Sequence, residues 1–155
     1  MELSQDILKQ YCSFLKNIKY IGIVQDVKLE HCTYIDDNNI NDGDHHIILR
    51  LIRIRKPMRN KGYGSIVLND VINLADSYNV RIVLYASEKY GSNIMGLYRF
   101  YENHDFILIK NDQDKKMIHY PNMNVHLNKF NVQLNDSIVQ LPIVQLHNSI
   151  LQEKK

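Results

Sequence analysis

The stretch that decides the fold is residues 46–65, HIILRLIRIRKPMRNKGYGS, in which a strand pattern runs into a helix through a basic, glycine-bearing turn. Its first ten residues mix a continuous apolar run with alternation, which is typical of a buried central strand. Pro57 ends that strand, because proline has no amide to donate to a neighbouring strand. The amphipathic helix that follows carries a wide apolar stripe made of Val67, Leu68, Val71, Ile72, Leu74, Ala75 and Tyr78.

Helix and strand patterns alternate on both sides of this stretch. Helices are predicted at 4–19, with Ser4 as N-cap, and at 93–103. The remaining predicted strands are 20–29, 80–86, 106–110 and 116–120. In the first of them, Ile21, Ile23 and Val27 are expected on one face. The alternation from residue 46 onward indicates a mixed α/β (α+β) sheet flanked by helices.

Two further segments differ in composition from the rest. Residues 36–44, DDNNINDGD, predict a loop, and their acidity would favour a cationic substrate. Residues 121–155 are too apolar for a disordered tail. We therefore expect one domain at 1–120 and a C-terminal extension at 121–155, which either adds strands or packs on a partner subunit in a homodimer.

The turn after the central strand has the composition of an anion site. The first amides of a helix have no partners within the helix and lie at the positive end of its dipole. They therefore bind phosphate-type anions. Gly62 and Gly64 allow a ligand to approach the backbone, Arg59 and Lys61 add positive charge, and Ser65 offers a hydroxyl. The pattern is neither a Walker A loop nor a complete dinucleotide-binding fingerprint.

Residues 59–64, RNKGYG, resemble the Arg/Gln-x-x-Gly-x-Gly/Ala signature of the GNAT acetyltransferase superfamily. Downstream, FYENHDF at 100–106 is similar to that family's Leu-Tyr-Glu-x-x-Gly-Phe block, with Asp105 in place of the usual glycine. Asp tolerates a left-handed backbone better than most residues, so the turn is expected to survive. The resemblance covers about residues 46–120. It implies a twisted mixed sheet splayed at its two central strands, with an acyl-CoA wedged in the gap.

The resemblance also implies a set of acetyl-CoA contacts. The amides of residues 60–65 would hold the pyrophosphate, and the exposed backbone around Ile52 and Ile54 would pair with the pantetheine arm like an extra strand. Asn93 and Tyr98 would line the other side, although Asn93 lies one residue further from Tyr101 than is common. The full expected set is Ile52, Ile54, Arg59, Asn60, Lys61, Gly62, Tyr63, Gly64, Ser65, Asn93 and Tyr98.

The resemblance assigns the leaving-group acid to Tyr101, with Tyr98, one turn earlier, as the alternative. A phenol with a pKa of about 10 stays protonated at neutral pH and can donate to the departing sulfur. A backbone amide near Ile54 would stabilise the oxyanion. The general base is Glu88, just past the second central strand, or Glu30, or a chain of water molecules.

The bulk composition excludes several other classes. The 155 residues carry a formal charge of +2 without a Lys/Arg-rich block, which argues against nucleic acid as a partner. No apolar run approaches the ~20 residues that cross a bilayer, and the N-terminus lacks a signal-peptide pattern. The seven histidines and two cysteines show no metal-ligand spacing. We expect a cytoplasmic protein without a metal or membrane partner.

The sequence thus predicts an N-acetyltransferase that moves an acetyl group from acetyl-CoA to a primary amine of a protein or small molecule by direct transfer. Asp105 and the shifted Asn93 also allow an alternative, a catalytically degenerate CoA-binding or regulatory module with the same fold. Transfer to any amine acceptor would distinguish the enzyme from the module.

Overall fold

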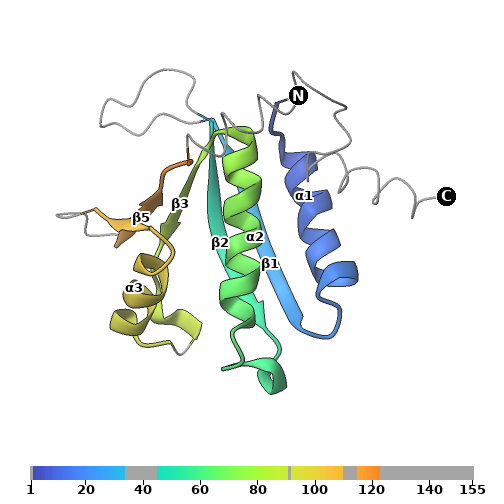
Figure 1. Ribbon diagram of the computed structural model, residues 1–155, viewed down its shortest axis with the longest axis vertical. Coiled ribbons are helices and arrows are strands. Elements are labelled where there is room, and N and C mark those ends of the chain that lie inside the picture. Colours follow the sequence, from blue (N-terminus) through green and yellow to red (C-terminus); the bar gives the residue numbers. More distant parts are fainter. Residues whose placement is uncertain (1, 34–44, 91, 110–114, 123–155) are drawn as a thin grey trace.

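The computed structural model describes residues 2–33, 45–90, 92–109 and 115–122 (Figure 1). Its helices are α1 (Gln5–Phe14), which continues into a π-helical turn (Leu15–Lys19), α2 (Tyr63–Tyr78) and α3 (Ile94–Glu102). Its strands are β1 (Val24–Cys32), β2 (His46–Ile54), β3 (Arg81–Tyr85), β4 (Ile107–Leu108) and β5 (Lys116–His119). The predicted acidic loop at 36–44 and residues 123–155 of the predicted extension lie outside the described residues.

The strands form one mixed sheet in the order β1-β2-β3-β5-β4. β2 and β3 are parallel, whereas β1 with β2, β3 with β5 and β4 with β5 are antiparallel. This mixed sheet flanked by helices confirms the predicted fold class.

One apolar core joins α1, α2 and the inner face of the sheet. The helices lie side by side over β1 and β2 in Figure 1, and their fully buried contacts include Leu8, Leu15, Ile47, Val67 and Leu68. At the end of α1 the Tyr20 hydroxyl donates a hydrogen bond to Asp70 of α2, and Lys19 Nζ lies 2.9 Å from the same carboxylate oxygen. These two polar contacts hold the end of the first helix against α2 at the edge of the core.

Helix boundaries follow the predicted capping residues. The Ser4 hydroxyl accepts a hydrogen bond from the Ile7 amide at 3.3 Å, as expected for an N-cap. Just after the C-terminal end of α3, Asp105 takes the left-handed conformation, with a φ of 64°. The amide of Phe106 then bonds back to the Tyr101 carbonyl at 3.1 Å. The turn that the sequence expected Asp105 to preserve is therefore formed.

The predicted start of the first strand is wrong. Residues 20–23 form a turn, β1 begins only at Val24, and the side chain of Ile21 is 71% exposed. Gly22 has a φ of 79°, a left-handed value that breaks the extended pattern between Ile21 and Ile23. The two-residue spacing of Ile21 and Ile23 resembles one face of a strand, but both precede β1. Of the three residues predicted on that face, only Val27 lies in β1, where it is buried.

Candidate acyl-donor cleft

The two central strands separate soon after they meet. β2 and β3 pair only at His46 with Arg81, Ile47 with Ile82 and Ile48 with Val83, although β2 continues to Ile54. On its other side β2 stays paired with β1 as far as Ile54. Among the described residues, the edge of β2 that faces β3 therefore has no strand partner from Leu49 onward, as a splayed sheet requires.

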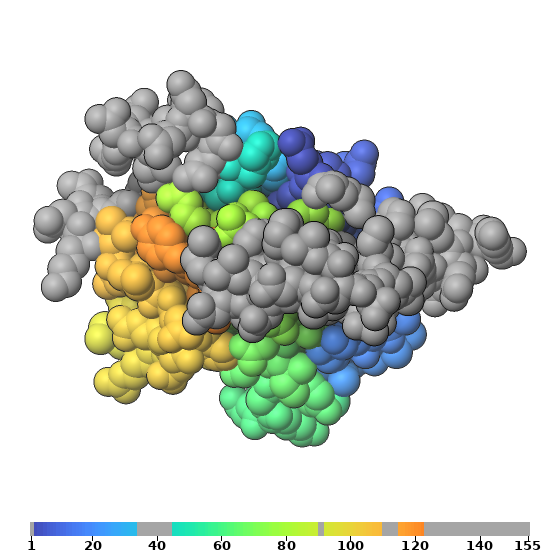
Figure 2. All heavy atoms as spheres, turned by 45° about the horizontal axis from the view of Figure 1, so that its top comes forward, coloured from blue at the N-terminus to red at the C-terminus, as the bar shows by residue number. Residues whose placement is uncertain are grey.

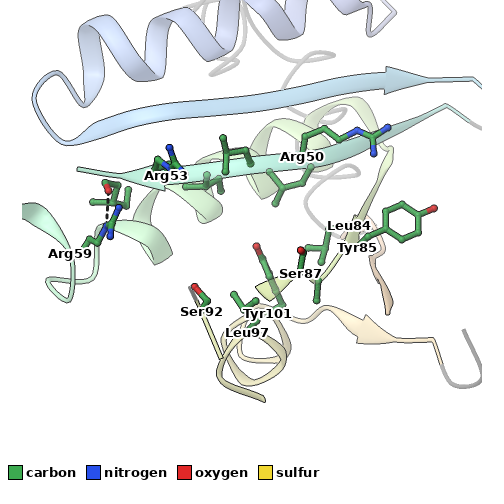
Figure 3. Close-up of a pocket in the computed structure, with 14 residues that line it drawn as sticks. Arg50, Arg53, Arg59, Leu84, Tyr85, Ser87, Ser92, Leu97 and Tyr101 are labelled. Carbon is green, nitrogen blue, oxygen red and sulfur yellow. Dashed lines mark hydrogen bonds between the residues drawn. The ribbon is translucent and has the colours of Figure 1, made fainter. Parts of the chain in front are cut away.

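A cavity of about 300 Å³ fills the gap between the strands. β2 contributes one wall, and β3, the loop after it and α3 contribute the other (Figure 3). The lining residues are Leu49, Arg50, Leu51, Ile52, Arg53, Ile54, Arg59, Leu84, Tyr85, Ala86, Ser87, Ser92, Leu97 and Tyr101. Four of the predicted site residues are thereby brought together, namely Ile52, Ile54, Arg59 and Tyr101.

The cavity has two distinct ends in Figure 3. Arg59 and Ser92 lie at one end, where β2 finishes, and Arg50 and Tyr85 lie at the other. Tyr101 lies between them, with its hydroxyl directed toward β2. A long ligand lying along β2 would therefore pass the Tyr101 hydroxyl partway along its length.

The predicted anion-binding turn lies beyond the Arg59 end. Asn60 and Gly62 take left-handed conformations, with φ values of 61° and 84°, and α2 begins directly afterwards at Tyr63. Gly62 gives the helix no side-chain cap, and the first amide bonded back to it is that of Ile66, at 3.2 Å. The amides of Tyr63, Gly64 and Ser65 thus precede the first helical bond, which is the arrangement that binds anions.

Arg59 connects the turn to the end of β2. Its Nε donates a hydrogen bond to the Ile54 carbonyl at 3.0 Å, shown as a dashed line in Figure 3. Figure 2 shows the surroundings of this turn in green, projecting from the body of the molecule between α3 in yellow and the end of α1 in blue. Asn60, Lys61 and Gly62 are exposed there, and Tyr63, Gly64 and Ser65 are partly buried.

Tyr101 is held by aromatic contacts. Its ring packs edge-on against Phe100 and Phe106, with centroid distances of 5.2 and 5.4 Å. Burial raises the pKa of Tyr101 above its ordinary value of 10.0. The phenol is consequently neutral throughout the physiological range and can donate a proton.

Besides the turn at 60–65, three predicted site residues at or near α3 lie outside the lining of the cavity. The Asn93 side-chain oxygen accepts hydrogen bonds from the amides of Met95 and Gly96, at 2.8 and 3.2 Å, and so caps α3. Glu88 accepts from the Ile94 amide at 3.1 Å and supports the same helix end. Tyr98 is partly buried and packs against the core. Roles for Asn93, Glu88 and Tyr98 in binding or catalysis stay predictions.

Several lining residues were not singled out by the sequence. Arg50 and Arg53 belong to a strand pattern in which charged residues suggest only a solvent-facing side. The other residues of this kind lie at the end of β3 or after it, namely Tyr85, Ser87 and Ser92. They line the cavity because β2 and β3 separate beside them. The alternation of arginine with apolar residues at 50–54 was the one available signal.

Within residues 2–33, 45–90, 92–109 and 115–122, no three His, Cys, Asp or Glu side chains are grouped so as to hold a metal ion. No helix among the same residues has the length and hydrophobicity needed to cross a membrane.

No protein-family model matches the chain, and no curated protein matches its sequence. Solved structures with a similar fold include a mutant of the AtaT toxin bound to the C-terminus of the antitoxin AtaR and acetyl-CoA, at 12% identity and a TM-score of 0.49. That match covers 66% of this chain but 61% of the AtaT chain, so the chain spans less than two thirds of its length.

Two further matches are of the same quality. The Bacillus subtilis N-acetyltransferase YlbP in complex with coenzyme A shares 14% identity, with a TM-score of 0.49 over 78% of this chain and 93% of YlbP. The KacTA–DNA complex shares 14% identity, with a TM-score of 0.47 over 80% and 84% of the two chains. At this level of similarity the geometry of the cleft alone must carry the function of this chain. The absence of a nucleic-acid partner stays a prediction.

Proposed function

We propose that the chain is an acetyl-CoA-dependent N-acetyltransferase that acts on a primary amine by direct transfer. The observation that carries the proposal is the separation of β2 from β3 after Ile48. In the part of the chain that the structure describes, it leaves a strand edge without a partner along a cavity that ends at Arg59, shortly before α2. An unpaired strand edge accepts an extended amide-bearing chain through backbone hydrogen bonds. The beginning of α2 suits a phosphate-type anion. Acetyl-CoA combines these two chemical features in one molecule.

The residues present fit this donor substrate. The left-handed Asn60 and Gly62 expose the amides of Tyr63, Gly64 and Ser65, and Lys61 adds a positive charge to the same turn. Ile52 and Ile54 would receive the amide-bearing arm along β2. Arg59, which is bonded to the Ile54 carbonyl, would lie between the arm and the phosphates. Asn93 and Tyr98 are proposed to border the arm from α3.

Tyr101 is proposed as the acid of the reaction. The amine nitrogen forms a bond to the acetyl carbonyl carbon, the carbon–sulfur bond breaks, and its electron pair goes to sulfur. Tyr101 then donates its hydroxyl proton to the sulfur and is reprotonated from solvent. The amine loses a proton to Glu88, to Glu30 or to water. Positioning of both substrates in the cleft supplies much of the rate.

Two measurements test this function. Calorimetric titration of the folded chain with acetyl-CoA should show one saturable site, and absence of binding would remove the proposal. Tyr101→Phe should lower kcat by roughly ten- to a hundredfold, the usual range for losing one acid–base group, while the Kd for acetyl-CoA stays within about twofold. An unchanged kcat would exclude Tyr101 as the acid and move the assignment to Tyr98.

The proposed base can be tested separately from the cap that Glu88 provides. Glu88→Gln keeps an oxygen that can accept from the Ile94 amide, so the beginning of α3 should be preserved. The substitution removes the ability to take a proton. A fall in kcat without a change in unfolding temperature would support Glu88 as the base, whereas an unchanged kcat would assign it to the cap alone.

The degenerate CoA-binding module is the second candidate, and one observation favours it. Among the described residues, none of those that line the cavity is an Asp or Glu. A module without a base would bind acetyl-CoA and release no free thiol with any amine. Acceptor-dependent thiol release would exclude it.

A further inference from the structure

The end of the cavity opposite the anion turn carries a positive side chain. Arg50 lies on β2, four residues before Ile54, and the two are separated by about 13 Å of extended strand. In Figure 3 Arg50 and Tyr85 lie at this end, and Arg59 lies at the other. If the phosphates lie at the beginning of α2, Arg50 is too far away to be their partner. Its ion-pair partner among the described residues is Glu30 on β1, which does not line the cavity, so a ligand at this end would meet Arg50 in the lining.

The proposed chemistry identifies what must enter at this end. On the proposed function, the donor would enter from the Arg59 side, and its reactive group would stop near the Tyr101 hydroxyl, which lies between the two ends in Figure 3. The acceptor nitrogen must then approach from the remaining side, which Arg50, Tyr85 and Ser87 line. Tyr85 is 44% exposed and the Arg50 side chain 50% exposed, so this mouth is open to solvent.

The lining of this mouth presents a guanidinium and, among the described residues, no carboxylate. Arg50 Nε donates a hydrogen bond to Glu30 Oε2 at 2.8 Å, so this ion pair occupies one of the five N–H donors of the guanidinium. Glu30 lies on β1 and does not line the cavity. Two other cations do not add to this end, because Arg53 lies toward the Arg59 end in Figure 3 and Lys28 Nζ lies 3.8 Å from Asp26 Oδ2.

We infer that the acceptor is a primary amine that also carries an anionic group, such as a carboxylate or a phosphonate, and that Arg50 selects it. This inference rests on the proposed acetyl transfer. Guanidinium groups bind such anions through paired hydrogen bonds, whereas a second ammonium group would be repelled. The expectation of a cationic acceptor came from residues 36–44, which lie outside the described residues, and Arg50 at the mouth points to the opposite charge.

A matched set of small amines tests the inference. The set is 4-aminobutyrate, 3-aminopropylphosphonate, 3-aminopropanol and 1,3-diaminopropane, which share the aminopropyl unit and differ in the charge of the far group. With saturating acetyl-CoA, thiol release and chromatography of the acetylated product give kcat/KM for each. We expect kcat/KM for each of the two anionic amines to exceed that for 1,3-diaminopropane by roughly tenfold or more, which is the effect of one charge-assisted contact.

Variants assign this preference to Arg50. Arg50→Gln should reduce the ratio of anionic to cationic kcat/KM about tenfold, and Arg50→Glu should invert it. Glu30→Gln removes the carboxylate that pairs with Arg50. Because Glu30 is also a candidate general base, this variant is compared only through the ratio of anionic to cationic kcat/KM, which should stay the same or rise. In all three variants the Kd for acetyl-CoA by calorimetry should stay within about twofold, because the donor binds at the other end.

Failure of the inference is distinguishable from failure of the proposed function. If the parent chain does not bind acetyl-CoA, the proposed function fails. If it binds acetyl-CoA but prefers 1,3-diaminopropane, or acetylates neither anionic amine, only the inference is overturned. A ratio that Arg50→Gln leaves unchanged would likewise overturn the role of Arg50.

Discussion

Replacing Gly64 by Asp should strengthen folding and weaken acetyl-CoA binding, two effects of opposite sign from one side chain. Gly64 is the second residue of α2, and a Cβ there would meet only the Phe100 ring, at 3.7 Å. That is an ordinary van der Waals contact, so the new side chain fits. Its carboxylate would lie at the positive end of the helix dipole, where it contributes about 0.3–1 kcal/mol to stability. Replacing glycine within a helix adds a few tenths more.

The same carboxylate would occupy the place proposed for the pyrophosphate. Two unit charges about 5 Å apart repel by roughly 3 kcal/mol at an effective dielectric constant of 20. Exposure and salt reduce this repulsion to about half, roughly 1.5 kcal/mol, which corresponds to about a tenfold loss of affinity. Gly64→Asn is the matched control, since asparagine has the same shape without the charge.

The assay combines calorimetry with acetyl-CoA and urea unfolding of the parent and both variants. The Gly64→Asp variant should bind acetyl-CoA about tenfold more weakly than Gly64→Asn. This difference in affinity should become smaller in 0.5–1 M salt, because screening lengths there are only a few ångströms. Gly64→Asp should also have the higher free energy of unfolding of the two. Equal affinities of the two variants would refute an anion site at the beginning of α2, whatever their stability.

Two further predictions concern stability. Asp105→Gly should raise the free energy of unfolding by about 0.5–1 kcal/mol in urea titrations, because Asp105 has a φ of 64° and glycine adopts this conformation without steric cost. A fall in stability would mean that contacts of the Asp105 side chain stabilise the fold by more than its backbone conformation costs. Tyr20→Phe should lower the free energy of unfolding by about 1.5–3 kcal/mol, because the hydrogen bond to Asp70 is lost. Burial first and Asp70 second raise the pKa of Tyr20, so this contribution is complete below pH 10 and is lost as the pH rises above it. Equal stabilities of parent and variant at pH 7 would contradict this prediction.

The local elements of the cleft could be predicted from the sequence because short-range rules determine them. The strand at 46–54 and the helix after it follow from apolar patterning and from Pro57. The N-cap at Ser4 and the left-handed Asp105 follow from side-chain chemistry at turns. The same rules failed at residues 20–23, where two apolar residues flank Gly22 and imitate a strand face inside a turn.

The composition of the cavity wall could not be predicted in the same way. Arg50 and Tyr85 line a cavity only because β2 and β3 stop pairing after Ile48, and pairing is a property of two strands that no local pattern records. Glu88 and Asn93 pose the opposite difficulty. Their residue types suit a ligand or a proton, but the carboxylate and the amide oxygen bond to the free amides at the beginning of α3.

The placement of the cleft has a cause in the connection between its two strands. Because β2 and β3 are parallel, the chain must cross back between them, and α2 makes that crossing. The helix therefore begins at the carboxyl end of β2, which is also the end at which the strands have parted. In open sheets with parallel strands, ligands bind outside the carboxyl ends of the strands, near the positive ends of the following helices. The gap and the positive helix end thus arise from the same connection. A substitution that extended the β2–β3 pairing to Leu49 and Leu84 would therefore close the edge of β2 proposed to bind the pantetheine arm, while leaving the α2 amides in place. Such a variant should still bind an isolated phosphate group but no longer bind acetyl-CoA more tightly than that group.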